Sequence, residues 1–173
     1  MLESALRKAI ENGAIEIYIQ PIIDCATDTV SGCEALARWT DPELGFVSPG
    51  EFIPVAEETG LIVPLGKLVL KEACAFFTDC HAREYSLQSI GVNISPRQCR
   101  EDGFVGLVKS THEHAGNRLN QLTLEIIEGV MFVESQTHRF DIMMLIKTLG
   151  ARRPLDNFET GYRSLPYLSR LPI

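Results

Sequence analysis

Apolar residues recur along this chain with two different periods, and the periods divide it into predicted helices and strands. Residues 2–11 carry apolar side chains every three to four positions and end at Asn12-Gly13, a pattern that predicts an amphipathic helix. Residues 15–20 alternate instead, with isoleucines at odd positions and polar or aromatic residues at even ones, which predicts a half-buried strand. The same two patterns predict strands at 32–39, 90–94 and 122–127, and helices at 49–60, 64–80, 104–114 and 137–149.

The order of these elements indicates the topology of the sheet. A short polar turn at 24–28 separates the first two strands, so we expect them to pair as an antiparallel hairpin. From residue 87 onward, strands and helices alternate, which is typical of a parallel sheet covered by helices.

The strand at 32–39 contains charged residues on an otherwise apolar face. Alternation places Glu34, Leu36 and Arg38 on one face, and Cys33, Ala35, Ala37 and Trp39 on the other. Buried charge is costly unless it is paired. Either Glu34 and Arg38 reach solvent at the strand ends, or they belong to a polar site.

Three later residues favour a polar site. Asn93, Glu125 and Asp156 each lie at or near the end of a short apolar run. A barrel assembles a site for a hard cation by supplying one oxygen-bearing side chain from each of several successive strands. Asn93 also has a simpler interpretation, as an amide that bonds to the backbone next to a turn. Glu57 and Glu58 are expected on a solvated helix face.

Composition excludes several classes of function. The net charge is −7 and no run of Lys or Arg forms a basic stripe, so binding to DNA or RNA polymers is disfavoured. The five cysteines show no C-x-x-C spacing, which fits reduced thiols and a cytoplasmic location. No apolar run approaches about 18 residues and the first helix is charged, so we expect neither a membrane span nor a signal peptide.

The motif Glu34-Ala35-Leu36 resembles the one that names the EAL domain family, whose active members hydrolyse the bacterial second messenger cyclic-di-GMP to the linear dinucleotide. The resemblance extends, in order, over residues 20–22, 34–39, 52–62, 92–95, 124–128 and 156–162. It implies an α/β fold, a TIM-barrel-like (β/α)8 variant with an antiparallel first strand. Such barrels typically need about 250 residues. We therefore expect residues 1–173 to form a single EAL-type domain with about five strands, missing roughly its last third.

The resemblance also assigns roles to individual residues. It implies Mg²⁺ or Mn²⁺ as cofactor, held by the metal ligands Glu34, Asn93, Glu125 and Asp156. Cyclic-di-GMP would contact Gln20, Leu36 and Arg38, with Arg38 on a phosphate. The catalytic residues would be Glu34 together with Glu128, which steadies the loop at 156–162.

Some positions depart from the family pattern. Asn157 replaces the second of two paired aspartates, and Glu159 replaces a glycine in the loop that should approach the ligand. The family's general base would lie beyond Ile173, and without a base the attacking water has no proton acceptor. We therefore expect this chain alone not to hydrolyse cyclic-di-GMP.

Two interpretations follow. The chain is the front part of a phosphodiesterase, or it is a non-catalytic module that binds the nucleotide or a protein partner. The family pattern is compatible with flanking sensory or cyclase domains in the native protein. Five strands cannot close a barrel, so we also expect a homodimer that shields the open edges.

Overall fold

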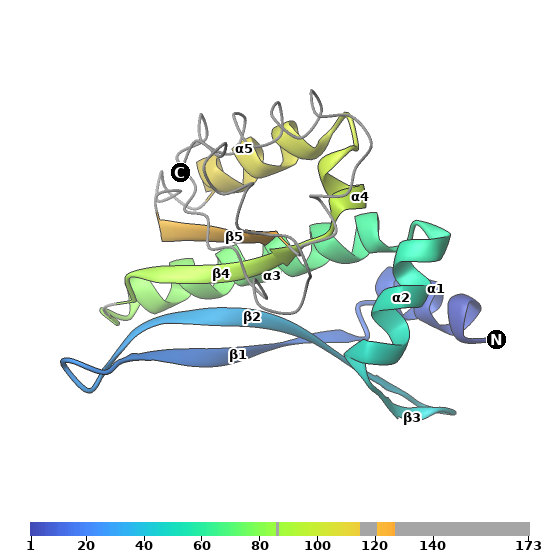
Figure 1. Cartoon of the computed structure of the whole chain (residues 1–173), viewed down its shortest axis with the longest axis horizontal. Helices are drawn as coiled ribbons and strands as arrows, with labels where there is room; N and C mark the ends of the chain where they lie inside the picture. Colours follow the sequence, from blue (N-terminus) through green and yellow to red (C-terminus); the bar gives the residue numbers. More distant parts are fainter. Residues whose placement is uncertain (86, 115–120, 127–173) are drawn as a thin grey trace, which may run out of the picture.

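The strands of the chain form one mixed sheet in the residues that the computed structural model describes, which are 1–85, 87–114 and 121–126 (Figure 1). The helices are α1 (Leu2–Glu11), α2 (Pro49–Thr59), α3 (Ile62–Ala82), α4 (Pro96–Cys99) and α5 (Phe104–His114). The strands are β1 (Ile15–Asp24), β2 (Thr29–Asp41), β3 (Gly45–Val47), β4 (Ser89–Ile94) and β5 (Leu122–Ile126). The helix predicted at 137–149 lies outside the described residues.

The sheet has the order β1-β2-β4-β5, with β3 paired to the far end of β2. β1 and β2 are antiparallel, and Gln20 lies opposite Glu34, as the predicted hairpin requires. β2, β4 and β5 are parallel to one another. An α/β fold with an antiparallel first strand is therefore confirmed. Strand β3 was not predicted, because three residues are too few to show alternation.

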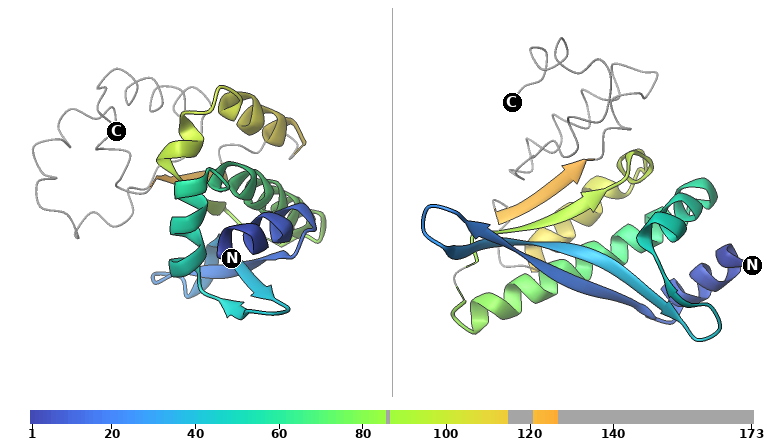
Figure 2. Two further views of the ribbon diagram at one scale, coloured as in Figure 1. Left: turned by 90° about the vertical axis from the view of Figure 1, so that its right-hand side faces the viewer. Right: turned by 60° about the horizontal axis from the view of Figure 1, so that its bottom comes forward.

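One face of the sheet forms the core with α3. Cys33, Ala35 and Trp39 of β2 are buried, as the alternation predicted, together with Val92 of β4 and Leu124 of β5. Helix α3 lies along this face (Figure 1), and the β1–β2 pair extends beyond the other strands as a long curved ribbon (Figure 2). None of the helices in the described residues is long and apolar enough to cross a bilayer.

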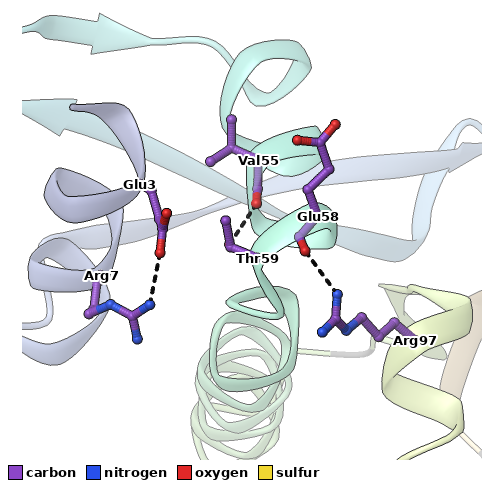
Figure 3. Close-up of polar contacts among 6 residues, drawn as sticks. All are labelled: Glu3, Arg7, Val55, Glu58, Thr59 and Arg97. Carbon is purple, nitrogen blue, oxygen red and sulfur yellow. Dashed lines mark hydrogen bonds and ion pairs between the residues drawn. The ribbon is translucent and has the colours of Figure 1, made fainter.

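Helix α2 has well-defined ends. Ser48 and Glu51 form a capping box, and the backbone N–H of Ser48 donates to Glu51 Oε2 at 3.1 Å. Gly60 ends the helix in the left-handed conformation, with φ of 82°. Near that end the Thr59 hydroxyl donates back to the Val55 carbonyl at 2.7 Å (Figure 3). The next helix begins at Ile62, two residues before the predicted start.

The five cysteines are free thiols, and only Cys25 is exposed. Burial raises the pKa of Cys33 and of Cys74 to about 11, and that of Cys99 to about 12. Burial also raises the pKa of Cys80. Four thiols are therefore held in their neutral form over most of the pH range.

Candidate functional site

The second face of the sheet carries the polar side chains. Glu34 of β2 lies beside Gly91 of β4 in the parallel register, and Asn93 lies beside Glu125 of β5. Because side chains alternate along a strand, Glu34, Asn93 and Glu125 all point to the face opposite the core. The sheet therefore brings together three of the four predicted metal ligands.

Glu34 and Glu125 lie beside the bare Cα of Gly91, and Asn93 contacts Glu34. The amide nitrogen of Asn93 donates to Glu34 Oε1 at 2.6 Å, and both side chains are half-buried. A Cβ atom at Gly91 would overlap Glu125 Oε1 and lie 3.6 Å from Glu34 Cγ. Glu34 therefore does not simply reach solvent at a strand end, and Asn93 bonds to a carboxylate rather than to the backbone.

The donor set can be tested against the implied cation. Mg²⁺ and Mn²⁺ prefer oxygen ligands, and the cluster offers two carboxylates and one amide oxygen around the space that Gly91 leaves. Among the described residues, no group of three or more His, Cys, Asp and Glu side chains could hold a metal ion. Two carboxylates and an amide nevertheless fit a cation that keeps several of its waters, as Mg²⁺ does.

Arg38 lies further along the same face of β2. Its Nη1 donates to the Ala37 carbonyl at 2.9 Å, and its guanidinium lies 5.7 Å from the centre of the Tyr18 ring. Such a cation–π contact restricts the orientation of the guanidinium. Gln20 is exposed on β1 and Leu36 is half-buried on β2. All three predicted nucleotide contacts therefore share the face that carries Glu34.

A cavity of about 190 Å³ lies beyond the point where the pairing of β2 with β4 stops, after Ala35 and Val92. Its walls include side chains from β2, from the end of β4 and from the two helices that follow β3. The lining residues that matter for the site are Leu36, Arg38, Glu57, Asn93, Ser95 and Gln98. This cavity joins two of the predicted nucleotide contacts, Leu36 and Arg38, to Asn93.

Glu57 is half-buried, so the expectation that it lies on a solvated face is wrong. Its Oε1 accepts a hydrogen bond from the Ser95 hydroxyl at 3.0 Å. Glu58 is exposed, as expected, although its backbone carbonyl accepts from Arg97 at 3.2 Å (Figure 3). The apolar pattern of the helix could not predict the contact of Glu57 with Ser95, because the two residues are 38 positions apart in the sequence.

Two predicted site residues, Glu128 and Asp156, lie outside the described residues, and so do Asn157 and Glu159. Their roles stay predictions. Sequence reasoning missed Tyr18 as a neighbour of Arg38. The alternation of β1 could have indicated it, since Tyr18 shares a face with Gln20 and faces Leu36 across the hairpin.

Comparison with protein families gives one match over almost the whole chain. The family described as the EAL domain matches residues 3–173. The protein y4lL of Sinorhizobium fredii is 40% identical over 171 residues, which cover 99% of this chain and 20% of that protein. The oxygen sensor protein DosP of Escherichia coli is 35% identical over 173 residues, 100% of this chain and 22% of DosP. The chain thus spans about a fifth of these relatives.

A solved structure with the same arrangement is the MucR phosphodiesterase in complex with c-di-GMP. It superposes with a TM-score of 0.88 at 34% sequence identity, and the match covers 99% of this chain and 69% of that one. The described elements therefore have the arrangement seen in a phosphodiesterase domain.

Proposed function

Because the chain belongs to the EAL domain family, we propose that it binds cyclic-di-GMP on the sheet face that carries Glu34, and that the complete site serves hydrolysis to the linear dinucleotide. The observation that carries the proposal is that Glu34 and Glu125 lie beside Gly91 while Asn93 bonds to Glu34. The c-di-GMP complex of MucR, 34% identical to this chain, supports the choice of ligand.

Residues of β1 and β2 contact different parts of the nucleotide. Arg38 supplies a planar cation that suits a phosphate oxygen pair, and the Tyr18 ring limits the directions it can adopt. Leu36 supplies apolar contact surface beside the cavity, and Gln20 supplies amide groups from the exposed strand. The ligand thus lies along β2, with a phosphate directed to Arg38.

Glu34, Asn93 and Glu125, with Asp156, are the proposed ligands of Mg²⁺ or Mn²⁺. A bound divalent cation activates water and neutralises phosphoryl oxygens in phosphodiester hydrolysis. The chain's own contribution is to hold the two carboxylates beside Gly91, while the amide of Asn93 fixes one of them by its hydrogen bond. Glu128 is proposed to steady the loop at 156–162.

A second candidate function is binding of the nucleotide, or of a protein partner, without hydrolysis. Asn157 and Glu159 favour it, since a neutral amide replaces a charged ligand and a bulky acid replaces glycine. Measuring the product separates the two candidates. Formation of linear dinucleotide that depends on Glu34 indicates an enzyme, and tight binding with unchanged ligand indicates a binding module.

The first prediction tests the proposed site by titration calorimetry with cyclic-di-GMP in the presence of Mn²⁺. We expect the wild type to bind. Glu34→Ala should abolish the dependence on Mn²⁺, and Arg38→Ala should weaken binding by at least about tenfold, the effect of losing a hydrogen bond to a charged group. The control is Glu43→Ala, which removes an exposed carboxylate from the β2–β3 turn. Equal binding by all four proteins would place the nucleotide elsewhere.

Partners and location are also proposals. The chain spans about a fifth of DosP, whose name describes an oxygen sensor, and this supports sensory or cyclase domains flanking the EAL domain in the native protein. Self-association as a homodimer and a cytoplasmic location likewise remain proposals, as does the assignment of residues 1–173 to a single domain.

A further inference from the structure

The turn after β4 contains two buried polar residues, Ser95 and Gln98, each 4% exposed. Their contacts begin as an ordinary capping box at the start of α4. The backbone N–H of Ser95 donates to Gln98 Oε1 at 2.8 Å, and the Ser95 hydroxyl oxygen accepts from the backbone N–H of Arg97 at 3.2 Å. A helix of four residues needs little capping, yet both side chains are shielded from water.

Two further contacts join this turn to the end of α2. The Ser95 hydroxyl donates a hydrogen bond to Glu57 Oε1 at 3.0 Å. In the opposite direction, Arg97 Nη1 donates to the carbonyl of Glu57 at 2.5 Å. It also donates to the carbonyl of Glu58 at 3.2 Å (Figure 3). The last carbonyls of a helix lack helical partners, and a cation is favoured there. Each segment therefore satisfies polar groups of the other.

Helix α3 approaches the same turn. A Cβ atom at Gly66 would overlap the Gln98 amide, so the side chain of Gln98 lies directly against the α3 backbone. The turn after β4 is consequently held from two sides, by the end of α2 and by the first half of α3. This arrangement fixes where β4 ends.

The end of β4 matters because Asn93 lies there, two residues before Ser95. Asn93 bonds to Glu34, and it lines the same cavity as Ser95 and Glu57. A side chain that binds a metal must be held within about half an ångström of its binding position, and the residues that contact this side chain supply that precision. The Glu57–Ser95 bond is the nearest such support that the structure describes on the side of α2.

We propose that Glu57 is a positioning residue for Asn93: its carboxylate holds Ser95, and through the backbone of residues 93–95 it sets the position from which the Asn93 amide reaches Glu34. The part of this inference that concerns ligand affinity rests on the proposed function. A carboxylate suits the role, because it only accepts hydrogen bonds and a hydroxyl bonds more strongly to a charged acceptor than to a neutral one.

The test, our second prediction, begins without any ligand. In the 173-residue chain, the side-chain amide of Asn93 gives an NMR signal that Asn93→Asp identifies by its loss. Glu57→Ala should shift or broaden this signal, whereas Glu57→Gln, which keeps an acceptor for the Ser95 hydroxyl, should shift it less. Glu58→Ala is the matched control, because its side chain is exposed and only its backbone contacts Arg97. An Asn93 signal unchanged in Glu57→Ala would overturn the proposal.

The second measurement is the affinity for Mn²⁺ and for cyclic-di-GMP. Glu57→Ala should weaken Mn²⁺ binding by about tenfold, the lower end of the effect for residues that support a metal ligand. Glu57→Gln should recover most of the loss, and Glu58→Ala should bind like the wild type. A purely structural role would lower the melting temperature of Glu57→Ala without changing the Mn²⁺ affinity of the folded protein, and would overturn the proposal.

The outcomes separate the two proposals. If the wild type binds neither Mn²⁺ nor the nucleotide while the Asn93 signal still responds to Glu57→Ala, the proposed function fails and the positioning role stands. If the wild type binds and Glu57→Ala binds equally well, the positioning role fails alone. Should Glu57→Ala not fold, Ser95→Ala decides, because it removes the donor of the same hydrogen bond. An unchanged Asn93 signal and an unchanged Mn²⁺ affinity in that variant count against the role.

Discussion

At the scale of single residues, Gly91 gives the candidate site its shape. Any side chain there would enter the space that Glu125 Oε1 occupies and would contact Glu34. Glu34 and Glu125 come from β2 and β5, the two strands that flank β4, and like charges that share one space repel each other unless a cation lies between them. In the proposed site, the absence of a side chain at residue 91 leaves the space that the cation would use.

The third prediction is that Gly91→Ala weakens Mn²⁺ binding by about tenfold or more while changing the free energy of unfolding by no more than about 1 kcal/mol. The stability change is small because the overlapping atom is the end of a flexible Glu125 side chain, which can rotate away. Calorimetric titration and urea unfolding measure the two quantities. Unaltered Mn²⁺ affinity would show that the cation does not use the space beside Gly91.

The single-residue roles differ in how well the sequence predicts them. Alternation along β2 is a local property, and it placed Glu34, Leu36 and Arg38 on one face correctly. The contact of Glu57 with Ser95 joins residues 38 positions apart. The contact depends on where α2 and the turn after β4 lie in the folded chain, and no local pattern carries that information.

At the scale of elements, two glycines in helices illustrate how packing decides the effect of one substitution. Gly66 of α3 lies against the Gln98 side chain, and a Cβ atom there would overlap it. Gly106 of α5 has nothing within 4 Å of the Cβ position. In a helix, alanine is favoured over glycine by about 0.5–1 kcal/mol when no contact opposes it.

The fourth prediction follows from this contrast. Gly106→Ala should raise the free energy of unfolding by about 0.5–1 kcal/mol. Gly66→Ala should lower it by about 1–3 kcal/mol, the usual cost of overpacking, because Gln98 is buried and also bonds to Ser95. Urea denaturation of both variants provides the measurement. A stabilising Gly66→Ala would mean that α3 and α4 do not approach each other as described.

Elements with a strong periodic pattern were predicted closely, and weak patterns explain the differences. Helix α1 was predicted at its observed bounds, because an amphipathic repeat and a terminal Asn-Gly agree there. Helix α3 begins at Ile62 rather than at Pro64, because Leu61 and Ile62 are buried in the core and extend the apolar contact. Proline in a first helical turn loses no helical hydrogen bond, so it does not mark the start.

At the scale of the whole molecule, the buried thiols couple stability to pH. A thiol whose pKa is raised on folding keeps its proton in the folded state when the unfolded chain has already lost it. The thiol therefore contributes fully to the free energy of unfolding below its ordinary pKa of about 9. This contribution is lost as the pH rises through the pKa in the folded protein, which is about 11 for Cys33 and Cys74. Cys33, Cys74 and Cys99 should act together in this range.

The fifth prediction is that the free energy of unfolding falls between pH 8 and pH 10 by about 1 kcal/mol for each of these thiols. Urea unfolding at the two pH values measures the decrease. Cys33→Ala should reduce it, whereas Cys25→Ala, at an exposed turn position, should leave it unchanged. An identical decrease in both variants would assign the alkaline sensitivity to other groups.

The hydrogen bond between Glu34 and Asn93 also has a consequence for the chain as it is synthesised. The two residues are 59 positions apart. Chains grow at about 5–20 residues per second, so Glu34 exists for roughly 3–12 s before Asn93 has been added. During most of that interval the β1–β2 hairpin has neither its parallel neighbour β4 nor the whole of α3, so Cys33, Ala35 and Trp39 are not yet covered by the rest of the core. The nascent hairpin, with an apolar face and an unpaired strand edge, is then the species most exposed to aggregation and to capture by chaperones.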